Sequence, residues 1–429
     1  MSPPSAQANL ALVTRQTLRF WLLLIATGVT TGIAAGLLMR LLRAVQHLSW
    51  HYHTGRFLDA VAHAPLPRVF AVLGAAGVLI GLARLWLKRH RGSHGGEVNA
   101  AIWLEGGKLD VLQAVGGAVL SITGVGMGVA LGREGAPKQA GAAAASLLAD
   151  WTGLDTPQRC LLAACGAGAG MAAVYDVPLG GALFALEVLM GTLALPLVLP
   201  ALAAAGIATA TSWLLLPHAA VTYAVRFTAP PPPRLLLAAA LAGPVLGVAA
   251  SLYVRAIAWA DTRRPRGAWQ AVAPLPVLLV LAAAALRYPG LLGNGKDVVA
   301  LALTGALPLA TLGALLPLRV LATTACLASG APGGLFTPTL TVGAVLGALL
   351  GYLLPGTPPA LAALIGGGGF LAAATQGPVS TLVLLLELTQ RIDPQTVPLL
   401  LAIAGATVTA RLLGPCSIYN ARLPVKRNS

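Results

Sequence analysis

Charged and aromatic residues are scarce in this sequence. Lysine, arginine, aspartate and glutamate together make up 10% of the 429 residues, and aromatic residues make up 5%. A soluble domain carries about 25% charged residues, so this composition excludes a soluble globular protein. Apolar residues take their place, since 57% of the chain is hydrophobic and the mean hydropathy is +0.80. Apolar runs at 20–39, 69–87 and 235–254 are each long enough to cross a bilayer, which takes about 20 residues, and they predict an integral membrane protein.

Cysteine is also rare, and the few cysteines form no recognisable motif. Cys160, Cys165, Cys326 and Cys416 show no CxxC spacing, and we expect them to pack as small apolar side chains. The sequence also has no metal-ligand spacing and no pairing of a nucleophile with a base. We therefore expect no metal, no cofactor and no enzymatic activity. Two classes of function remain: transport across the membrane, and a non-transporting role as a membrane scaffold.

Acidic residues are outnumbered, with 13 against 28 lysines and arginines and a net charge of +15. A surface that attracts nucleic acid is one explanation. The basic residues, however, gather at 88–91, 263–266 and 422–427, each time after an apolar run, as in the cytoplasmic loops of membrane proteins. We therefore predict a multi-pass protein of the inner (plasma) membrane that contacts the lipid bilayer and no nucleic acid, with both termini in the cytoplasm.

Two short blocks of the sequence resemble each other at a distance of 200 residues. Residues 171–178 read Met-Ala-Ala-Val-Tyr-Asp-Val-Pro, and residues 371–378 read Leu-Ala-Ala-Ala-Thr-Gln-Gly-Pro. Nine residues after each closing proline stands a glutamate, Glu187 in the first block and Glu387 in the second. These glutamates either close the hydrogen bonds of a helix end or carry protons, and we favour the first role.

This similarity indicates an ancient duplication. We predict a first repeat over residues 15–215 and a second over 230–415, with the prolines at 230–233 between them. An odd number of membrane crossings in each half would invert one half relative to the other. The expected fold is a single all-α polytopic membrane domain over residues 1–429. Only ten residues follow Tyr419, so we expect no C-terminal regulatory domain.

Two glycine–proline segments interrupt the apolar runs about 200 residues apart. Residues 132–137 read Gly-Arg-Glu-Gly-Ala-Pro, and residues 333–338 read Gly-Gly-Leu-Phe-Thr-Pro. Irregular backbone at membrane depth survives only where protein buries it or where it lines a polar cavity. A helix that starts there directs free N–H groups and a partial positive charge at its surroundings, which favours an anion. Paired interruptions in two halves therefore predict an anion site near the middle of the membrane.

Arg133 and Glu134 place opposite charges inside the first of these segments. One explanation is a buried ion pair that serves stability alone. Ionisable residues within a membrane are costly, however, and mark functional sites. An ionised Glu134 would occupy the anion site at the helix start and a protonated one would leave it, so this carboxyl is a candidate gate and proton acceptor. Lys138 follows one helical turn later, where it could pair with Glu134, hold an anion or extend to the interface.

Four further positions offer hydrogen-bond donors to an anion. In the second segment, Leu335 and Phe336 offer backbone N–H groups at a helix start, without a cation that would trap the ion. Ser93 lies in a glycine-rich turn and offers a hydroxyl. Tyr419, near the end of the last apolar run, is either an interfacial tyrosine or a hydroxyl donor to the anion.

Together these segments resemble the CLC family of chloride channels and transporters, whose signatures read GSGIP, GREGP and GGxFxP, with a tyrosine near the end of the membrane domain. The match covers nearly the whole chain. The resemblance implies a homodimer with one anion path per subunit, and two inverted repeats of tilted and broken helices in each subunit. It also implies that Ser93 and Tyr419 donate hydroxyls, and Leu335 and Phe336 backbone amides, to a central chloride, with Glu134 as the gate. Supporting residues in or beside the matched segments are Gly132, Arg133, Gly135, Lys138, Gly334, Pro338, Glu187 and Val188.

The chain departs from the family pattern at three places. Residues 94–96 read His-Gly-Gly in place of Gly-Ile-Pro, which predicts a looser inner mouth. Ala136 stands where the family usually has proline, with the proline one position later. Val188 follows Glu187 where proton-coupled bacterial members often carry a second glutamate, the inner proton relay.

These departures bear on the transport mode. An apolar Val188 favours passive or gated, channel-like chloride conduction, with proton–chloride antiport through Glu134 as the alternative. Since Ser93 and Tyr419 are kept, the resemblance implies chloride as the substrate, with bromide and nitrate tolerated. Fluoride is the remaining alternative.

Overall fold

The computed structural model describes residues 18–90, 95–216, 222–225, 230–354, 356–414 and 416–423. Within these ranges the regular structure is helical, apart from one antiparallel bridge between Gly132 and Gly334. The prediction of an all-α polytopic fold is confirmed. Seven described segments are long and apolar enough to cross a membrane: α2 (Leu18–Trp50), α4 (Leu66–Arg89), α10 (Leu195–Ser212), α11 (Pro233–Thr262), α12 with α13 (Trp269–Arg287), α15 (Leu309–Ser329) and α19 (Thr396–Leu413).

Shorter helices fill the space between these spans. In the first half they are α3 (Phe57–Ala62), α5 (Val98–Leu104), α6 (Val111–Gly126), α7 (Gly135–Thr152), α8 (Thr156–Tyr175), α9 (Pro178–Leu183) and the π-helix η1 (Phe184–Met190). In the second half they are η2 (Pro289–Leu291), α14 (Lys296–Thr304), α16 (Phe336–Tyr352), α17 (Pro359–Thr375), α18 (Pro378–Thr389) and η3 (Asn420–Arg422).

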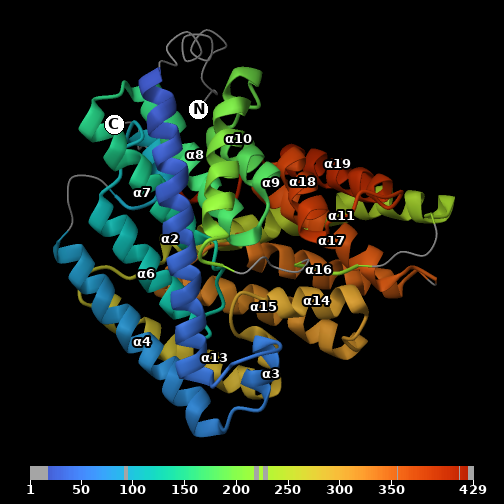
Figure 1. Ribbon diagram of the computed structural model, residues 1–429. Helices are drawn as coiled ribbons and strands as arrows, with labels where there is room; N and C mark the ends of the chain where they lie inside the picture. The colour runs from blue at the N-terminus through green and yellow to red at the C-terminus, as the bar shows by residue number, and fades with distance from the viewer. Residues whose placement is uncertain are drawn as a thin grey trace.

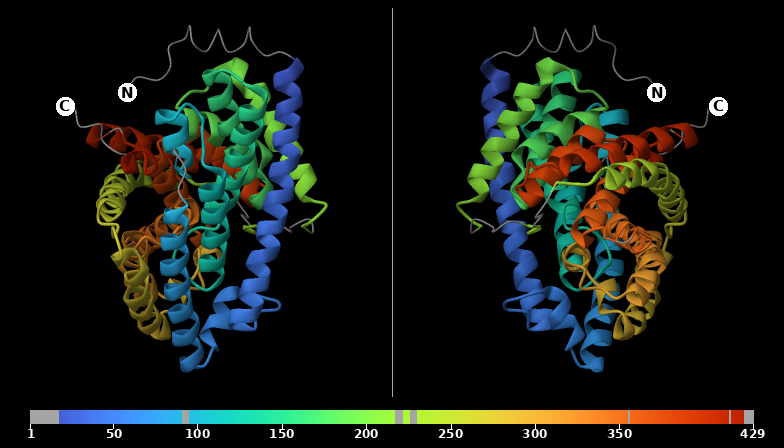
Figure 2. Two further views of the ribbon diagram at one scale, coloured as in Figure 1. Left: turned by 90° about the vertical axis from the view of Figure 1, so that its left-hand side faces the viewer. Right: turned by 90° about the vertical axis from the view of Figure 1, so that its right-hand side faces the viewer.

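The two halves of the chain occupy opposite sides of the molecule and meet in the middle. Figure 1 shows the blue to green helices of the first half on one side and most of the yellow to red helices of the second half on the other. In both views of Figure 2, the long helix α2 runs from one end of the molecule towards the other. Several helix contacts tie the halves together: α12 (Trp269–Val272) and α13 (Pro274–Arg287) pack against α4, and α18 packs against α9.

Glycine lets the helices within each half approach closely. Gly141 of α7 faces Gly166 of α8, and a Cβ atom on either would collide with the carbonyl of the other. Gly347 of α16 faces Gly366 of α17 in the same way. Such small-residue contacts are typical of membrane helices, which lack a hydrophobic driving force between them. The 50 glycines of the chain therefore serve packing as well as turns.

Glu187 and Glu387 exchange contacts between the two halves. The carboxylate of Glu187 accepts hydrogen bonds from the backbone N–H groups of Val379 (3.1 Å) and Ser380 (2.6 Å), at the start of α18. The carboxylate of Glu387 accepts from Leu179 (3.0 Å) and Gly180 (2.6 Å), at the start of α9. A carboxylate at a helix start satisfies N–H groups that have no partner within the helix. This is the helix-closing role favoured from the sequence.

The helices before α9 and α18 also end alike. Asp176 after α8 has φ 58° and Gln376 after α17 has φ 59°, so each chain turns through the left-handed region before the next helix. The halves differ at one element, because Val188 lies in the π-helix η1 while α18 stays α-helical. The side chain of Val188 is buried. The repeat boundaries at 15–215 and 230–415 stay a prediction.

Candidate functional site

The two glycine–proline segments meet at the centre of the molecule. The N–H group of Gly132 donates to the carbonyl of Gly334 and the N–H group of Gly334 donates back, both at 2.7 Å. Helix α7 begins at Gly135 and helix α16 at Phe336, so two helix starts lie side by side. Glycine is required here, since a Cβ atom on Gly135 would lie 2.7 Å from the nitrogen of Gly334. Pro338 stands in the first turn of α16, where its missing N–H costs no helical hydrogen bond.

The carboxylate of Glu134 lies against the start of α16. Its Oε1 accepts the N–H of Phe336 at 2.7 Å, and its Oε2 accepts the hydroxyls of Thr337 at 3.0 Å and Tyr175 at 3.1 Å. The hydroxyl oxygens of Tyr175 and Thr337 lie 2.6 Å apart. Glu134 is only 3% exposed. A free N–H at a helix start is a ready anion site, and here the side chain of Glu134 occupies it as a tethered anion.

Arg133 does not neutralise Glu134. Both residues are described, and they form no ion pair. The guanidinium of Arg133 instead lies 4.9 Å from the centre of the Tyr175 ring, as a cation–π contact. The structure therefore does not contain the buried Arg133–Glu134 ion pair that was one explanation of these two charges.

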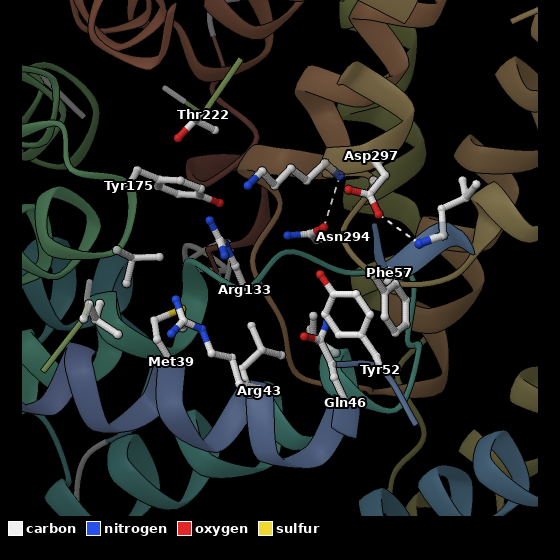
Figure 3. A pocket seen from close by; sticks show the side chains of 18 of the residues that line it. Met39, Arg43, Gln46, Tyr52, Phe57, Arg133, Tyr175, Thr222, Asn294 and Asp297 are labelled. Carbon is white, nitrogen blue, oxygen red and sulfur yellow. Dashed lines mark hydrogen bonds between the residues drawn. The ribbon is translucent and has the colours of Figure 1, made fainter. Parts of the chain in front are cut away.

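A cavity opens on each side of Glu134. The first, named here the Arg133 cavity, has a volume of about 290 Å³ and is lined by Arg133 and Tyr175 among others (Figure 3). The second, the Lys138 cavity, has about 560 Å³ and is lined by Gly135, Lys138 and Tyr419 among others. Glu134 lies between these two linings in the chain, since Arg133 before it lines one cavity and Gly135 after it lines the other.

Basic side chains predominate in both cavities. Those of the Arg133 cavity are Arg43, Arg133 and Lys296, beside Asp176 and Asp297. Those of the Lys138 cavity are Arg84, Lys88, Lys138, Arg264, Arg266 and Arg422, beside Glu97 and Glu105. A cavity lined by one sign of charge raises the local concentration of ions of the opposite sign. Both cavities therefore attract anions towards Glu134.

Burial and neighbouring charges shift the pKa values of several of these groups, among them Lys296 and Glu97. Burial and the nearby Arg133 lower the pKa of Lys296 to about 8. The guanidinium of Arg422, 3.0 Å from the carboxylate of Glu97, holds the pKa of Glu97 below its usual range. Lys296 thus changes its charge in a mildly alkaline solution, while Glu97 stays ionised.

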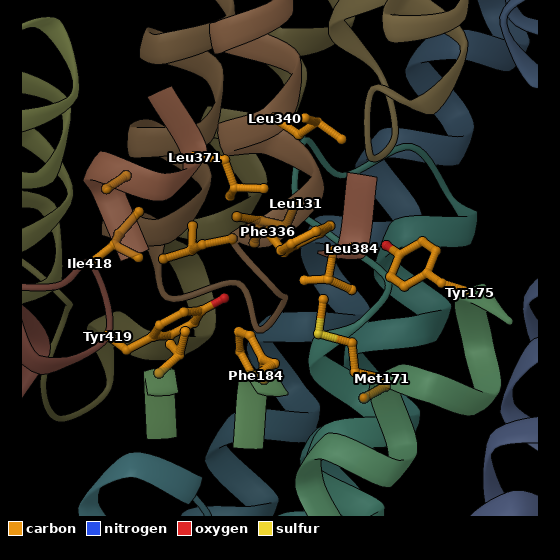
Figure 4. Packing of buried hydrophobic residues seen from close by; sticks show 14 of the residues in the cluster. Leu131, Met171, Tyr175, Phe184, Phe336, Leu340, Leu371, Leu384, Ile418 and Tyr419 are labelled. Atoms are coloured by element: carbon orange, nitrogen blue, oxygen red, sulfur yellow. The ribbon is translucent and has the colours of Figure 1, made fainter. Parts of the chain in front are cut away.

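Tyr419 and Lys138 meet in the Lys138 cavity. The Nζ of Lys138 lies 4.3 Å from the centre of the Tyr419 ring and 6.0 Å from that of Phe184. The rings of Phe184 and Tyr419 pack edge to face at 5.7 Å, as Figure 4 shows. Leu335 lines the same cavity just before α16 begins. Lys138 therefore forms no ion pair with Glu134 in the structure, while an anion contact and an extension to the interface stay predictions.

The structure brings together most of the residues singled out in the sequence. Glu134, Phe336, Leu335 and Tyr419 lie around the meeting point of α7 and α16, whereas Ser93 lies outside the described residues. Two partners of Glu134 were missed. They are Tyr175, in the duplicated block at 171–178, and Thr337, inside the second glycine–proline segment.

A signal for these two partners was present in the sequence. Thr337 is a hydroxyl residue inside the second glycine–proline segment, and Tyr175 is a hydroxyl residue of the duplicated block at 171–178. Their distance from Glu134 along the chain hid the contact. Among the described residues, no group of three or more histidine, cysteine, aspartate or glutamate side chains is placed to hold a metal ion.

Comparisons with known proteins agree with this geometry. The sequence model of the family described as "Voltage gated chloride channel" matches residues 75–411. The voltage-gated ClC-type chloride channel ClcB of Citrobacter koseri is 31% identical over 424 residues, covering 92% of this chain and 97% of the relative.

Two solved structures share the fold. A slow cyanobacterial Cl⁻/H⁺ antiporter has a TM-score of 0.79 at 22% identity, covering 94% of this chain and 96% of that one. A CLC-type fluoride/proton antiporter has a TM-score of 0.76 at 21% identity, covering 97% of this chain and 99% of that one. Since the family model spans most of its length and the relatives match nearly end to end, this chain belongs to the voltage-gated chloride channel (CLC) family.

Proposed function

We propose that this protein conducts chloride across the membrane in a passive or gated, channel-like manner, with Glu134 as the gate. The observation that carries the proposal is the position of the Glu134 carboxylate. It accepts the N–H of Phe336 at a helix start, between two cavities lined mainly by basic side chains. Chloride needs the same donor, so chloride and the carboxylate compete for one position. Chloride is the substrate, and the proposal needs no cofactor.

Gating follows from this competition. While Glu134 is ionised and bound, its carboxylate closes the way between the cavities. Protonation weakens its hold on the N–H of Phe336, because a neutral carboxyl is a poorer acceptor than a carboxylate. The side chain then leaves and chloride takes the vacated donors. The hydroxyls of Tyr175 and Thr337 steady the closed position.

Proton–chloride antiport is the second candidate. The hydroxyl of Tyr175 links Glu134 to the Arg133 cavity, which supplies a hydrogen-bonded route for protons on that side. On the other side, Val188 is buried and apolar, and the Glu187 carboxylate is occupied by backbone N–H groups. Val188 and Glu187 therefore offer no group to carry protons on that side, and this favours chloride conduction without proton coupling.

We also propose the orientation and assembly of the protein. The basic loops around Lys88, Arg264 and Arg422 border the Lys138 cavity, so this cavity would face the cytoplasm under the positive-inside rule. The inner membrane as location, cytoplasmic termini and a homodimer with one path per subunit are proposed from the same rule and from the family resemblance.

Flux measurements in liposomes test the proposal. The purified protein is reconstituted under an outward chloride gradient, and chloride efflux and external pH are recorded together. We expect chloride efflux without uphill proton movement. Proton uptake against its gradient, driven by chloride, would establish the exchanger instead. No chloride flux at all would refute both.

A further inference from the structure

Lys138 is an ammonium group on the anion path. It lies in the first turn of α7, one turn after Glu134, and its side chain lines the Lys138 cavity beside Tyr419. It is half-buried, and its nearest described partners are the rings of Tyr419 and Phe184.

The other buried or half-buried cations of the cavity have oxygen partners. Arg422 pairs with Glu97 at 3.0 Å and with Asp261 at 2.8 Å. Arg264 pairs with Asp261 at 3.0 Å. Arg84 donates to the carbonyl of Ser329 at 3.3 Å.

Lys138 differs, because no described carboxylate lies within ion-pair distance of its ammonium, and Glu97 attracts it only from farther away. Lys88 and Arg266 also lack one, but both are exposed to solvent. A cation held away from water is costly without a counter-ion, and an aromatic ring offsets only part of that cost.

We propose that the transported anion is the counter-ion of Lys138. In this view, which rests on the proposed chloride conduction, the ammonium is an additional ligand of a small monovalent anion at the position beside Tyr419 that the family resemblance already implies. This position is separate from the one that the Glu134 carboxylate fills at the N–H of Phe336.

The test measures chloride binding by calorimetry at neutral pH, with isethionate as the inert anion. Lys138→Met should weaken chloride binding at least about tenfold, since a hydrogen bond to a charged group is lost. Lys138→Arg keeps the charge and should stay within about threefold of the wild type. Lys88→Met, at the exposed rim of the same cavity, is the matched control and should leave the affinity unchanged.

A second measurement does not depend on how the variants fold. Crystals of the wild-type protein grown in bromide should show anomalous density in contact with the Nζ of Lys138. The absence of bromide density at Lys138 would overturn the inference and leave the proposed function intact. The same holds if Lys138→Met keeps the chloride affinity of the wild type while Tyr419→Ala binds chloride weakly. Absence of both chloride binding and chloride flux in the wild type would overturn the proposed function itself.

Discussion

At the scale of single residues, the proposed function depends mainly on the carboxylate of Glu134. Glu134 is buried, has no cation within ion-pair distance among the described residues, and accepts the N–H of Phe336 and two hydroxyls. Hydrogen bonds of this kind favour the charged form of a carboxylate. The proposed gating needs only the loss of this charge to weaken them.

Glu134→Gln should raise chloride flux and remove the dependence of that flux on pH. The amide has no charge and holds the N–H of Phe336 less firmly, so chloride displaces it at any pH. The measurement is chloride efflux from liposomes between pH 5 and pH 8. Asp150→Asn, at a half-exposed surface ion pair, serves as the control and should retain the wild-type profile. A pH profile that persists in Glu134→Gln would remove the gate from this residue.

Lys296 should add a second, weaker dependence on pH from the Arg133 cavity. Its pKa of about 8 means that it is charged below pH 8 and neutral above it. Raising the pH on that side from 7 to 9 should therefore slow chloride entry by up to about fivefold, since a unit charge at 4 Å in water is worth about 1 kcal/mol.

The measurement belongs in the Glu134→Gln background, where gating by the carboxylate is absent. Lys296→Met should abolish the decline between pH 7 and pH 9. If the decline survives this substitution, Lys296 does not act on anion entry, and another group of the cavity must titrate.

At the scale of elements, the site depends on helices that start in the interior. Helices α7 and α16 begin where their segments touch through Gly132 and Gly334, and α9 and α18 begin against a glutamate from the opposite half. Interior helix starts expose N–H groups that must find acceptors. Side-chain carboxylates serve as acceptors at three of these helix starts, those of α9, α16 and α18. Glu187 and Glu387 accept the N–H groups at the starts of α18 and α9, and Glu134, the proposed gate, accepts the N–H of Phe336 at the start of α16.

Glu387→Gln should destabilise the fold without changing anion selectivity. The substitution removes a charge that accepts the N–H groups of Leu179 and Gly180, and the loss of such a helix cap costs about 0.5–2 kcal/mol. Thermal unfolding in detergent should show a lower Tm, and Glu187→Gln should behave alike because its contacts mirror those of Glu387. Bromide-to-chloride permeability ratios should remain those of the wild type. A changed ratio would place these glutamates in the anion path.

At the scale of the whole molecule, two cavities lined mainly by basic side chains reach the residues next to Glu134 in the chain, Arg133 and Gly135. The two halves of the chain meet there, so each half contributes one glycine–proline segment to the barrier (Figure 1). Arg422, the last residue of η3, forms ion pairs with Glu97 and Asp261 at the edge of the Lys138 cavity. These ion pairs hold the chain three residues after Tyr419.

Much of this could be predicted from the sequence because the signals are local. Low charge and long apolar runs predict membrane helices wherever they occur. The turns at 132–137 and 333–338 need glycine and proline whatever surrounds them. The expectation that Glu187 and Glu387 close helix ends also came from their fixed spacing after a proline.

The sequence by itself thus determined an all-α membrane protein with broken helices that favour an anion, because composition and backbone chemistry decide those features over a few residues. Only the tertiary structure decided which groups meet. Phe336 and Thr337 lie about 200 residues from Glu134, and Tyr419 lies still farther from Lys138. Such contacts depend on how whole helices pack, and no local pattern specifies that packing. The fold alone therefore brings the Glu134 carboxylate to the start of α16. It also places the Lys138 ammonium beyond ion-pair distance of the described carboxylates.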